Sequence, residues 1–246
     1  MNIFIYDSYL NQKKYNKELI ALERKITDLG LNGKIIRLGM LSSLENTVED
    51  ELKKRPKTII VVGGDALVNQ VAGLMSGCET PLAVVPMGES NQIANGLGIS
   101  TKEACAVLLS RRILNFDLGM VDDQPFVKNV VVVGKKISLL IDDKLAVNLE
   151  NPQLAEVINF SQPSSDELLE GLLLNPADGL FGLLIVKKIK HWFKSELSRS
   201  FFACKNIKIQ AADGVIVDGF KTMAKAHEIH LLKNRLNIIV GKNRNF

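Results

Sequence analysis

Two consecutive strand–turn–helix patterns between residues 58 and 97 constrain the fold of this chain more than any other feature. The first begins with the β-branched run 58–62, which predicts a strand buried on both faces, and it ends at the turn 63–65. The second repeats that order, with an apolar run at 81–85 and a small-residue turn at 86–91. Because such units place helix N-termini and glycine turns at one edge of a parallel sheet, they predict a phosphate or nucleotide site there.

The residues before this segment continue the same alternation of strands and helices. Apolar runs at 3–6 and 34–38 predict two more buried strands. Between them, apolar residues from Tyr15 to Leu29 recur at steps of three and four, which predicts an amphipathic helix. Ser42 and Glu45 fit a capping box that starts another helix. This alternation, from residue 1 to about 110, predicts a doubly wound parallel sheet.

The pattern changes after residue 112, where short β-type runs are separated by polar turns. The predicted strands of this half lie at 126–133, 137–141, 180–186, 207–210, 215–217, 229–232 and 237–240. Their close spacing indicates an antiparallel sandwich or barrel. We therefore expect an α/β + β fold, with an α/β nucleotide-binding domain at 1–116 and a β-sandwich domain at 117–246.

One basic segment, 187–194, has the pattern of a helix that interrupts the second half, and it carries the only Trp of the chain. Two interpretations stay open for this segment. It is an interfacial element that meets anionic lipid, or a connector helix whose aromatic side chains pack on the sandwich.

Composition narrows the functional classes. The net charge of +4 permits a polyanionic ligand or an acidic membrane surface, whereas 6% aromatic residues and no long Lys/Arg run argue against nucleic acid. Three scattered cysteines predict neither a disulfide framework nor a zinc site, and they fit a reducing cytoplasm. No apolar stretch reaches transmembrane length and no signal peptide is recognisable, so any membrane contact is expected to be peripheral. The oligomeric state, a homodimer included, is left open.

The two glycine turns also carry a family resemblance. Residues 62–71, V-G-G-D-A-L-V-N-Q-V, resemble the G-G-D-G-T-x-N-E-V signature of the diacylglycerol kinase catalytic domain. Bacterial lipid kinases and sphingosine and ceramide kinases share that signature. Residues 81–94 are similar to the family's P-L-x-x-x-P-x-G-T-x-N-D-x-A. In the second half, 175–180 resembles an Asp-Gly turn of the family's β-domain, and 217–220 stands where the family has D-G-E.

This resemblance implies ATP-dependent, Mg²⁺-assisted transfer of a phosphoryl group to the hydroxyl of a lipid substrate at a membrane surface. It assigns Asp218 as the catalytic base, Asp65 as a further catalytic residue and Asp178 as a metal ligand in the β-domain. The residues that it assigns to the phosphates of the nucleotide, and to the metal or water that accompanies them, are Gly63, Gly64, Asp65, Ala66, Asn69, Gly88, Glu89, Ser90 and Asn91.

Several phosphate-facing and metal-facing positions depart from the family pattern. The substituted positions are Asp7-Ser8, Leu38-Gly39, Ala66, Leu67, Glu89, Gln92 and Phe220. Ala66 replaces a glycine, and Glu89 places a carboxylate beside a site for phosphate. Two hypotheses follow, namely a working lipid kinase and a catalytically impaired relative that binds a nucleotide, lipid or protein. Under the second, Asp218 is only the Asp of an Asp-Gly hairpin turn.

Overall fold

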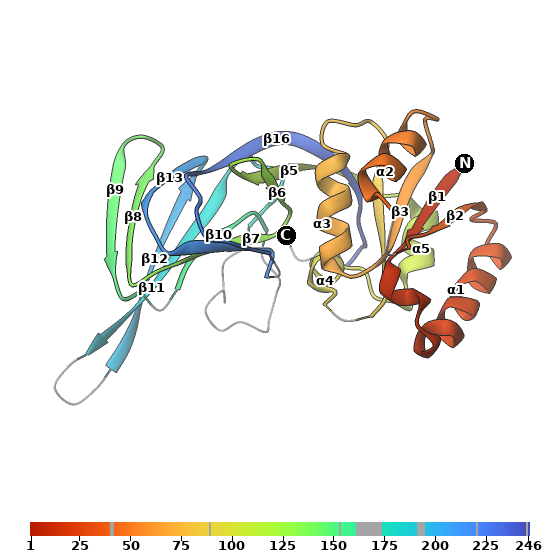
Figure 1. The fold of residues 1–246 in the computed structure, drawn as a ribbon, viewed down its shortest axis with the longest axis horizontal. Helices are drawn as coiled ribbons and strands as arrows, with labels where there is room; N and C mark the ends of the chain where they lie inside the picture. Colours follow the sequence, from red (N-terminus) through yellow and green to blue (C-terminus); the bar gives the residue numbers. More distant parts are fainter. Residues whose placement is uncertain are drawn as a thin grey trace. The chain divides into compact units, whose positions relative to one another are not determined.

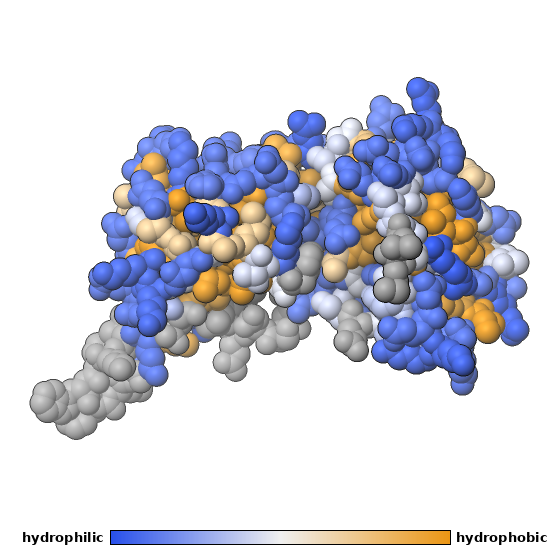
Figure 2. Space-filling model, in the orientation of Figure 1, coloured by the Kyte–Doolittle hydropathy of each residue, from blue (hydrophilic) through white to orange (hydrophobic). Residues whose placement is uncertain are grey.

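A computed structural model describes residues 1–39, 42–88, 90–152, 154–160, 174–190, 195–219, 221–244 and 246. The chain divides into two compact units (Figure 1). Unit 1 comprises Met1–Phe116 and Arg235–Asn245, and unit 2 comprises Asp117–Asn234 and Phe246. In Figure 2 the visible surface is mostly hydrophilic, with apolar areas between the polar ones. Within the described ranges, the helices are all too short or too polar to span a membrane.

Unit 1 is built on a parallel sheet. Its strands are β1 (Asn2–Tyr6), β2 (Gly33–Arg37), β3 (Thr58–Gly63) and β4 (Leu82–Pro86), in the order β2-β1-β3-β4. Strands β3 and β4 are buried along their whole length, as expected for strands covered on both faces. The end of β16 (Glu228–Ile239) adds beside β4, where Ile238 pairs in parallel with Leu82.

Helices cover the sheet of unit 1 on both faces. They are α1 (Asn16–Asp28), α2 (Leu44–Leu52), α3 (Asp65–Leu74), α4 (Gln92–Gly96) and α5 (Ala104–Ser110). The 3₁₀ turns η1 (Ser8–Asn11) and η2 (Lys13–Tyr15) precede α1. Helices α2 and α3 pack on each other (Figure 1). The Lys25 side chain of α1 donates to the Lys102 carbonyl just before α5, at 2.8 Å. The N-cap of α2 is Ser43, one residue after the expected Ser42, and its hydroxyl accepts the Asn46 N–H.

Unit 2 is antiparallel. One sheet has the order β12-β11-β10-β7-β14-β15, and the other pairs β9, β8, β13 and the start of β16, with β5 and β6 beside them. The bounds of these strands are β5 (Ile113–Val121), β6 (Gln124–Phe126), β7 (Asn129–Val133), β8 (Lys136–Ile141), β9 (Leu145–Glu150), β10 (Leu154–Ile158), β11 (Phe181–Lys190), β12 (Ser195–Cys204), β13 (Asn206–Ala211), β14 (Gly214–Val217) and β15 (Lys221–Met223).

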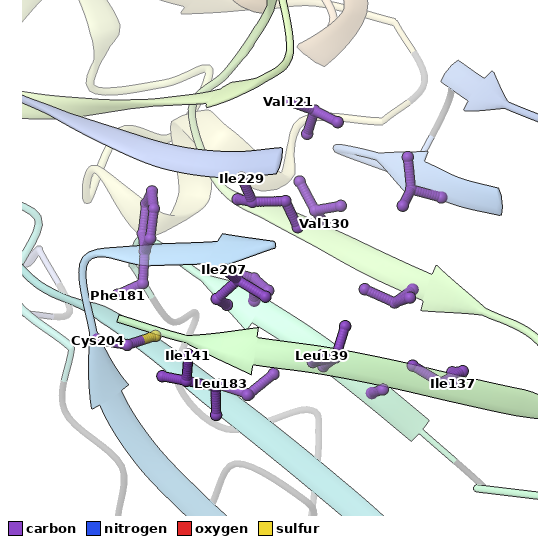
Figure 3. Packing of buried hydrophobic residues seen from close by; sticks show 14 of the residues in the cluster. Val121, Val130, Ile137, Leu139, Ile141, Phe181, Leu183, Cys204, Ile207 and Ile229 are labelled. Carbon is purple, nitrogen blue, oxygen red and sulfur yellow. The ribbon is translucent and has the colours of Figure 1, made fainter. Parts of the chain in front are cut away.

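The two sheets of unit 2 share one apolar core (Figure 3). Phe181, Leu183 and Cys204 of the first sheet lie in the same buried cluster as Leu139 and Ile207 of the second. A parallel-rich sheet in the first half and an antiparallel sandwich in the second confirm the α/β + β fold expected from the sequence.

Several features of the second half of the chain differ from the sequence-based expectation. The predicted helix at 187–194 is wrong, since Lys187 to Lys190 complete strand β11 and pair with β12, while 191–194 lie outside the described residues. A ten-residue ladder overrides the helical pattern of this short segment. The segment 235–245, expected in the second domain, packs with unit 1, where the Gly241 N–H donates to the Leu97 carbonyl at 2.8 Å.

Candidate phosphate-binding edge

Loops that follow three parallel strands lie side by side at the carboxyl edge of the sheet in unit 1. Tyr6 of β1 pairs with Val62 of β3, which pairs with Val85 of β4. Just beyond them, the Asp7 N–H donates to the Val62 carbonyl at 2.9 Å, and the Met87 N–H donates to the Gly63 carbonyl at 3.3 Å. The structure therefore brings both glycine turns together at the edge where open α/β sheets bind ligands.

Asp65 joins the two turns through its carboxylate. This side chain is only 3% exposed, and it accepts hydrogen bonds from the Ser90 hydroxyl at 2.8 Å and the N–H groups of Gln92 and Ile93 at 2.7 and 2.8 Å. The Asp65 N–H in turn donates to the Ser90 carbonyl at 2.9 Å. Since Gln92 and Ile93 begin α4, the Asp65 carboxylate caps this helix and fixes the second turn against the first.

The first turn leads directly into α3. Gly64 is the N-cap of this helix, with an extended backbone and no side-chain cap, and the partial positive charge of a helix N-terminus favours an anion. Ala66 is exposed in the first helical turn, and Asn69 is buried one turn later. Ala66 has no positive φ, so its replacement of the family's glycine carries no backbone strain, and its Cβ acts only by occupying space.

Two side chains of the loop after β1 contact the glycine turns. A Cβ built on Gly63 would lie 2.8 Å from the Cβ of Asp7. A Cβ on Gly88, whose φ is +88°, would lie 2.6 Å from the ring and hydroxyl of Tyr9, and that hydroxyl donates to the Met87 carbonyl at 2.5 Å. Glycine at 63 and 88 is thus required by the protein's own side chains. Asp7 was noticed in the sequence only as a departure from the family turn, and Tyr9 was missed.

The electrostatics of this edge are mixed. Burial raises the pKa of the half-buried Asp7 carboxyl, and hydrogen bonds from the backbone N–H groups of Tyr9 and Ser8 oppose that rise.

The second turn is shaped by its own residues. Asn91 donates its side-chain N–H to the Gly88 carbonyl at 2.9 Å, and Ser90 has a φ of +53°, a strained value for a residue with a side chain. Glu89, the other carboxylate assigned from the sequence, lies outside the described residues.

Asp218, the expected base, lies in unit 2 at the turn between β14 and β15. Its carboxylate accepts the N–H groups of Val127, Lys128 and Asn129 at 2.9, 2.9 and 2.8 Å. Burial raises the pKa of Asp218 to about 6, although the three N–H donors act in the opposite direction. With φ values of +47° and +76°, Asp218 and Gly219 form a hairpin turn that also anchors the loop before β7. The role of Asp218 as a catalytic base stays a prediction.

Asp178, the expected metal ligand, is exposed in the turn before β11. Its carboxylate accepts the Leu180 N–H at 2.9 Å, and the Gly179 N–H donates to the buried carboxylate of Asp117 at 2.7 Å. Within the described ranges, no group of three or more His, Cys, Asp or Glu side chains could hold a metal ion. Because the Asp65 carboxylate already accepts hydrogen bonds from three donors, this side chain does not fit as a ligand of a resident Mg²⁺.

The chain thus combines a parallel α/β unit, in which Asp65 joins two glycine turns, with an antiparallel sandwich. Residues 2–121 match the family model of the diacylglycerol kinase catalytic domain. This match confirms the resemblance seen in the sequence.

Solved structures from Bacillus anthracis str. Sterne are similar over almost the whole chain. One, a diacylglycerol kinase, has a TM-score of 0.76 and 16% identity over 98% of this chain and 97% of its own. A second from the same organism has a TM-score of 0.78 and 15% identity over 99% and 98% of the two chains. At this identity the likeness shows the fold. A search of curated proteins found no match.

Proposed function

We propose that this chain is an ATP-dependent lipid kinase that transfers the γ-phosphoryl group of ATP to a lipid hydroxyl such as that of diacylglycerol. The observation that carries the proposal is the joining of the two glycine turns by Asp65 at the carboxyl edge of the sheet. The match of residues 2–121 to the diacylglycerol kinase catalytic domain supports it. Phosphoryl transfer depends mainly on positioning and on stabilisation of phosphate charge, and a rigid pair of turns serves both.

In this proposal each part of the edge has a role. The uncapped N-terminus of α3, behind Gly63 and Gly64, receives the phosphates, and the turn at Gly88 to Asn91 forms the second wall. Mg²⁺ binds as the Mg²⁺-ATP complex and is therefore part of the nucleotide substrate. Asp218 accepts the proton of the lipid hydroxyl, for which a pKa of about 6 leaves it mostly ionised at neutral pH.

Tyr9 and Asp7 support a second candidate, a catalytically impaired relative that acts as a binding module. The ring of Tyr9 covers Gly88, and the carboxylate of Asp7 lies beside Gly63, at the two points where phosphates would approach the backbone. A ligand with a negative charge meets an acidic group there and must displace an aromatic ring.

The deciding experiment is transfer of labelled γ-phosphate from Mg²⁺-ATP to a panel of lipids that includes diacylglycerol, sphingosine and ceramide. The kinase predicts label in at least one lipid, dependent on both ATP and Mg²⁺. ATP binding by calorimetry, with no transfer to any lipid, would instead establish the binding module. A lipid acceptor together with ATP as the donor implies action at the cytoplasmic face of a membrane, with which the free cysteines Cys78, Cys105 and Cys204 are compatible.

Replacing Tyr9 by Ala should tighten ATP binding by about three- to tenfold, because the ring no longer has to leave Gly88 before a phosphate can approach. Titration calorimetry measures the change. Tyr9→Phe is the matched control, since it keeps the ring over Gly88 and removes only the hydrogen bond to Met87. Equal ATP affinity in the wild-type and Tyr9→Ala proteins would show that the ring does not stand in the path of the nucleotide.

A further inference from the structure

The hairpin of β11 and β12, here called the β11–β12 ribbon, has two chemically different faces. Residues directly opposite each other on antiparallel strands point to the same face. On one face Leu183 pairs with Phe202, and both pack in or against the core of unit 2. On the other face Leu184 pairs with Phe201, Val186 with Arg199 and Lys188 with Leu197. The second set therefore forms the outer face of the ribbon.

Large apolar side chains on this outer face are exposed. Leu197 is 52% exposed and Phe201 is 39% exposed. The Phe201 ring lies close over Gly182, where an added Cβ would be 2.5 Å from it. The buried Leu184 and Val186, which pair with Phe201 and Arg199, belong to an apolar cluster on the same side of the sheet. The exposed Leu197 and Phe201 on the outermost strand, β12, thus lie on the same side of the sheet as this buried apolar cluster.

The charges on the outer face have one sign. Lys188 and Arg199 are both exposed, and each lies beside an apolar outward residue of the ribbon. Outward positions of the two strands include no Asp or Glu in the sequence, since Glu196 is next to Leu197 along β12 and therefore points to the opposite face. Cations interleaved with exposed Leu and Phe suit a surface that is anionic at its boundary and apolar beneath it.

We infer that the outer face of the β11–β12 ribbon docks on an anionic phospholipid surface, with Leu197 and Phe201 entering the boundary of the acyl chains and Lys188 and Arg199 meeting the lipid phosphates. The inference rests on the proposed function, because a lipid acceptor lies in a membrane and the enzyme has to reach it there. It adds the surface that makes the contact.

Vesicle flotation without nucleotide tests this docking. The vesicles contain phosphatidylcholine and phosphatidylglycerol in equal parts, and vesicles of phosphatidylcholine alone serve as the comparison. Lys188→Gln with Arg199→Gln should weaken binding by about twenty-five-fold, roughly fivefold for each cation, and added salt should weaken the wild type similarly. Leu197→Ser with Phe201→Ser should weaken it by about tenfold or more.

Matched controls come from exposed residues elsewhere in the chain. Lys135→Gln with Lys136→Gln removes the same number of charges from another part of unit 2, and Leu145→Ser removes an exposed Leu from β9. These variants should bind vesicles as the wild type does. A thermal unfolding curve of each variant shows that it is folded.

Equal loss in the ribbon and control variants would overturn the inference, as would binding that does not depend on phosphatidylglycerol. So would self-association that the Leu197→Ser, Phe201→Ser pair abolishes without changing vesicle binding, because the face would then meet a second copy of the chain. The readout needs no catalysis. A protein that binds vesicles through the ribbon but transfers no phosphate refutes the proposed function alone, and an active kinase that ignores vesicles refutes the docking alone.

Discussion

Asp218→Asn is expected to reduce phosphoryl transfer by about a hundredfold or more while leaving ATP affinity nearly unchanged. The substitution keeps the size of the side chain and removes its ability to accept a proton. A base acts on the lipid hydroxyl rather than on ATP, so binding of the nucleotide should survive. Steady-state transfer rates and ATP calorimetry on the same preparations measure the two effects separately.

The structure adds a folding effect to this prediction. An amide at position 218 has one oxygen, so it cannot accept all three N–H groups that the two oxygens of Asp218 accept from Val127, Lys128 and Asn129. At least one buried donor loses its partner, which should lower the free energy of unfolding by about 1–3 kcal/mol. Denaturant titration measures this loss, and transfer rates are compared only where both proteins are folded.

Asn159→Ala is the matched control for the structural part. The Asn159 side chain donates to the carbonyls of Val127 and Asp117, both at 2.9 Å, so its loss loosens the same loop and keeps the Asp218 carboxylate. A base role requires that Asn159→Ala retain most of the transfer activity at comparable stability. If it instead lowers transfer as much as Asp218→Asn, Asp218 acts only through the loop that it holds.

The pH dependence of stability gives a second readout of Asp218. Its pKa is about 6 in the folded chain and near 3.8 in an ordinary environment, so the folded state binds this proton more tightly. Because the folded state then holds more protons between about pH 6 and pH 4, this group adds stability as the pH falls through that window. Asp218→Asn should remove this contribution, and denaturant titrations at both ends of the window would detect its loss.

Buried strands were the part of the fold that the sequence predicted best. The runs that became β1, β3 and β4 are continuous, apolar and rich in β-branched residues, a pattern that few other structures produce. Strands β9 and β12 were missed because most of their described side chains are exposed and neither strand alternates regularly between apolar and polar residues. Their positions depend on the partner strands β8 and β11, and therefore on tertiary pairing.

The candidate site shows the same division between local and tertiary information. The glycine turns were visible because they interrupt strong strand and helix patterns at adjacent positions along one edge. The contact of Tyr9 with Gly88 joins residues 79 positions apart, and no local pattern predicts it. The family resemblance assigned Asp65 to the phosphate site. It did not predict the contacts of the Asp65 carboxylate, because they depend on where α4 begins.

Those contacts make Asp65→Ala the second substitution with a large expected effect. It removes the buried carboxylate that accepts hydrogen bonds from three donors, the Ser90 hydroxyl and the N–H groups of Gln92 and Ile93. Two backbone donors at the start of α4 lose the cap that satisfies them, so the free energy of unfolding should fall by about 2–4 kcal/mol. Ser90→Ala, which removes only one of the three bonds, should cost about 0.5–1.5 kcal/mol.

Asp65→Ala should also break the hydrogen bonds that link the second glycine turn to the first. Amide hydrogen exchange of Gln92 and Ile93 should become much faster in Asp65→Ala than in Ser90→Ala, because only the former removes the acceptor of both N–H groups. ATP affinity should fall together with this protection if the two joined turns form the phosphate site. Asp178→Ala, the loss of an exposed carboxylate that accepts one backbone N–H, should change neither. Unchanged exchange in Asp65→Ala would mean that α4 is held by its apolar contacts alone. Faster exchange with unchanged ATP affinity would place the nucleotide away from the second turn.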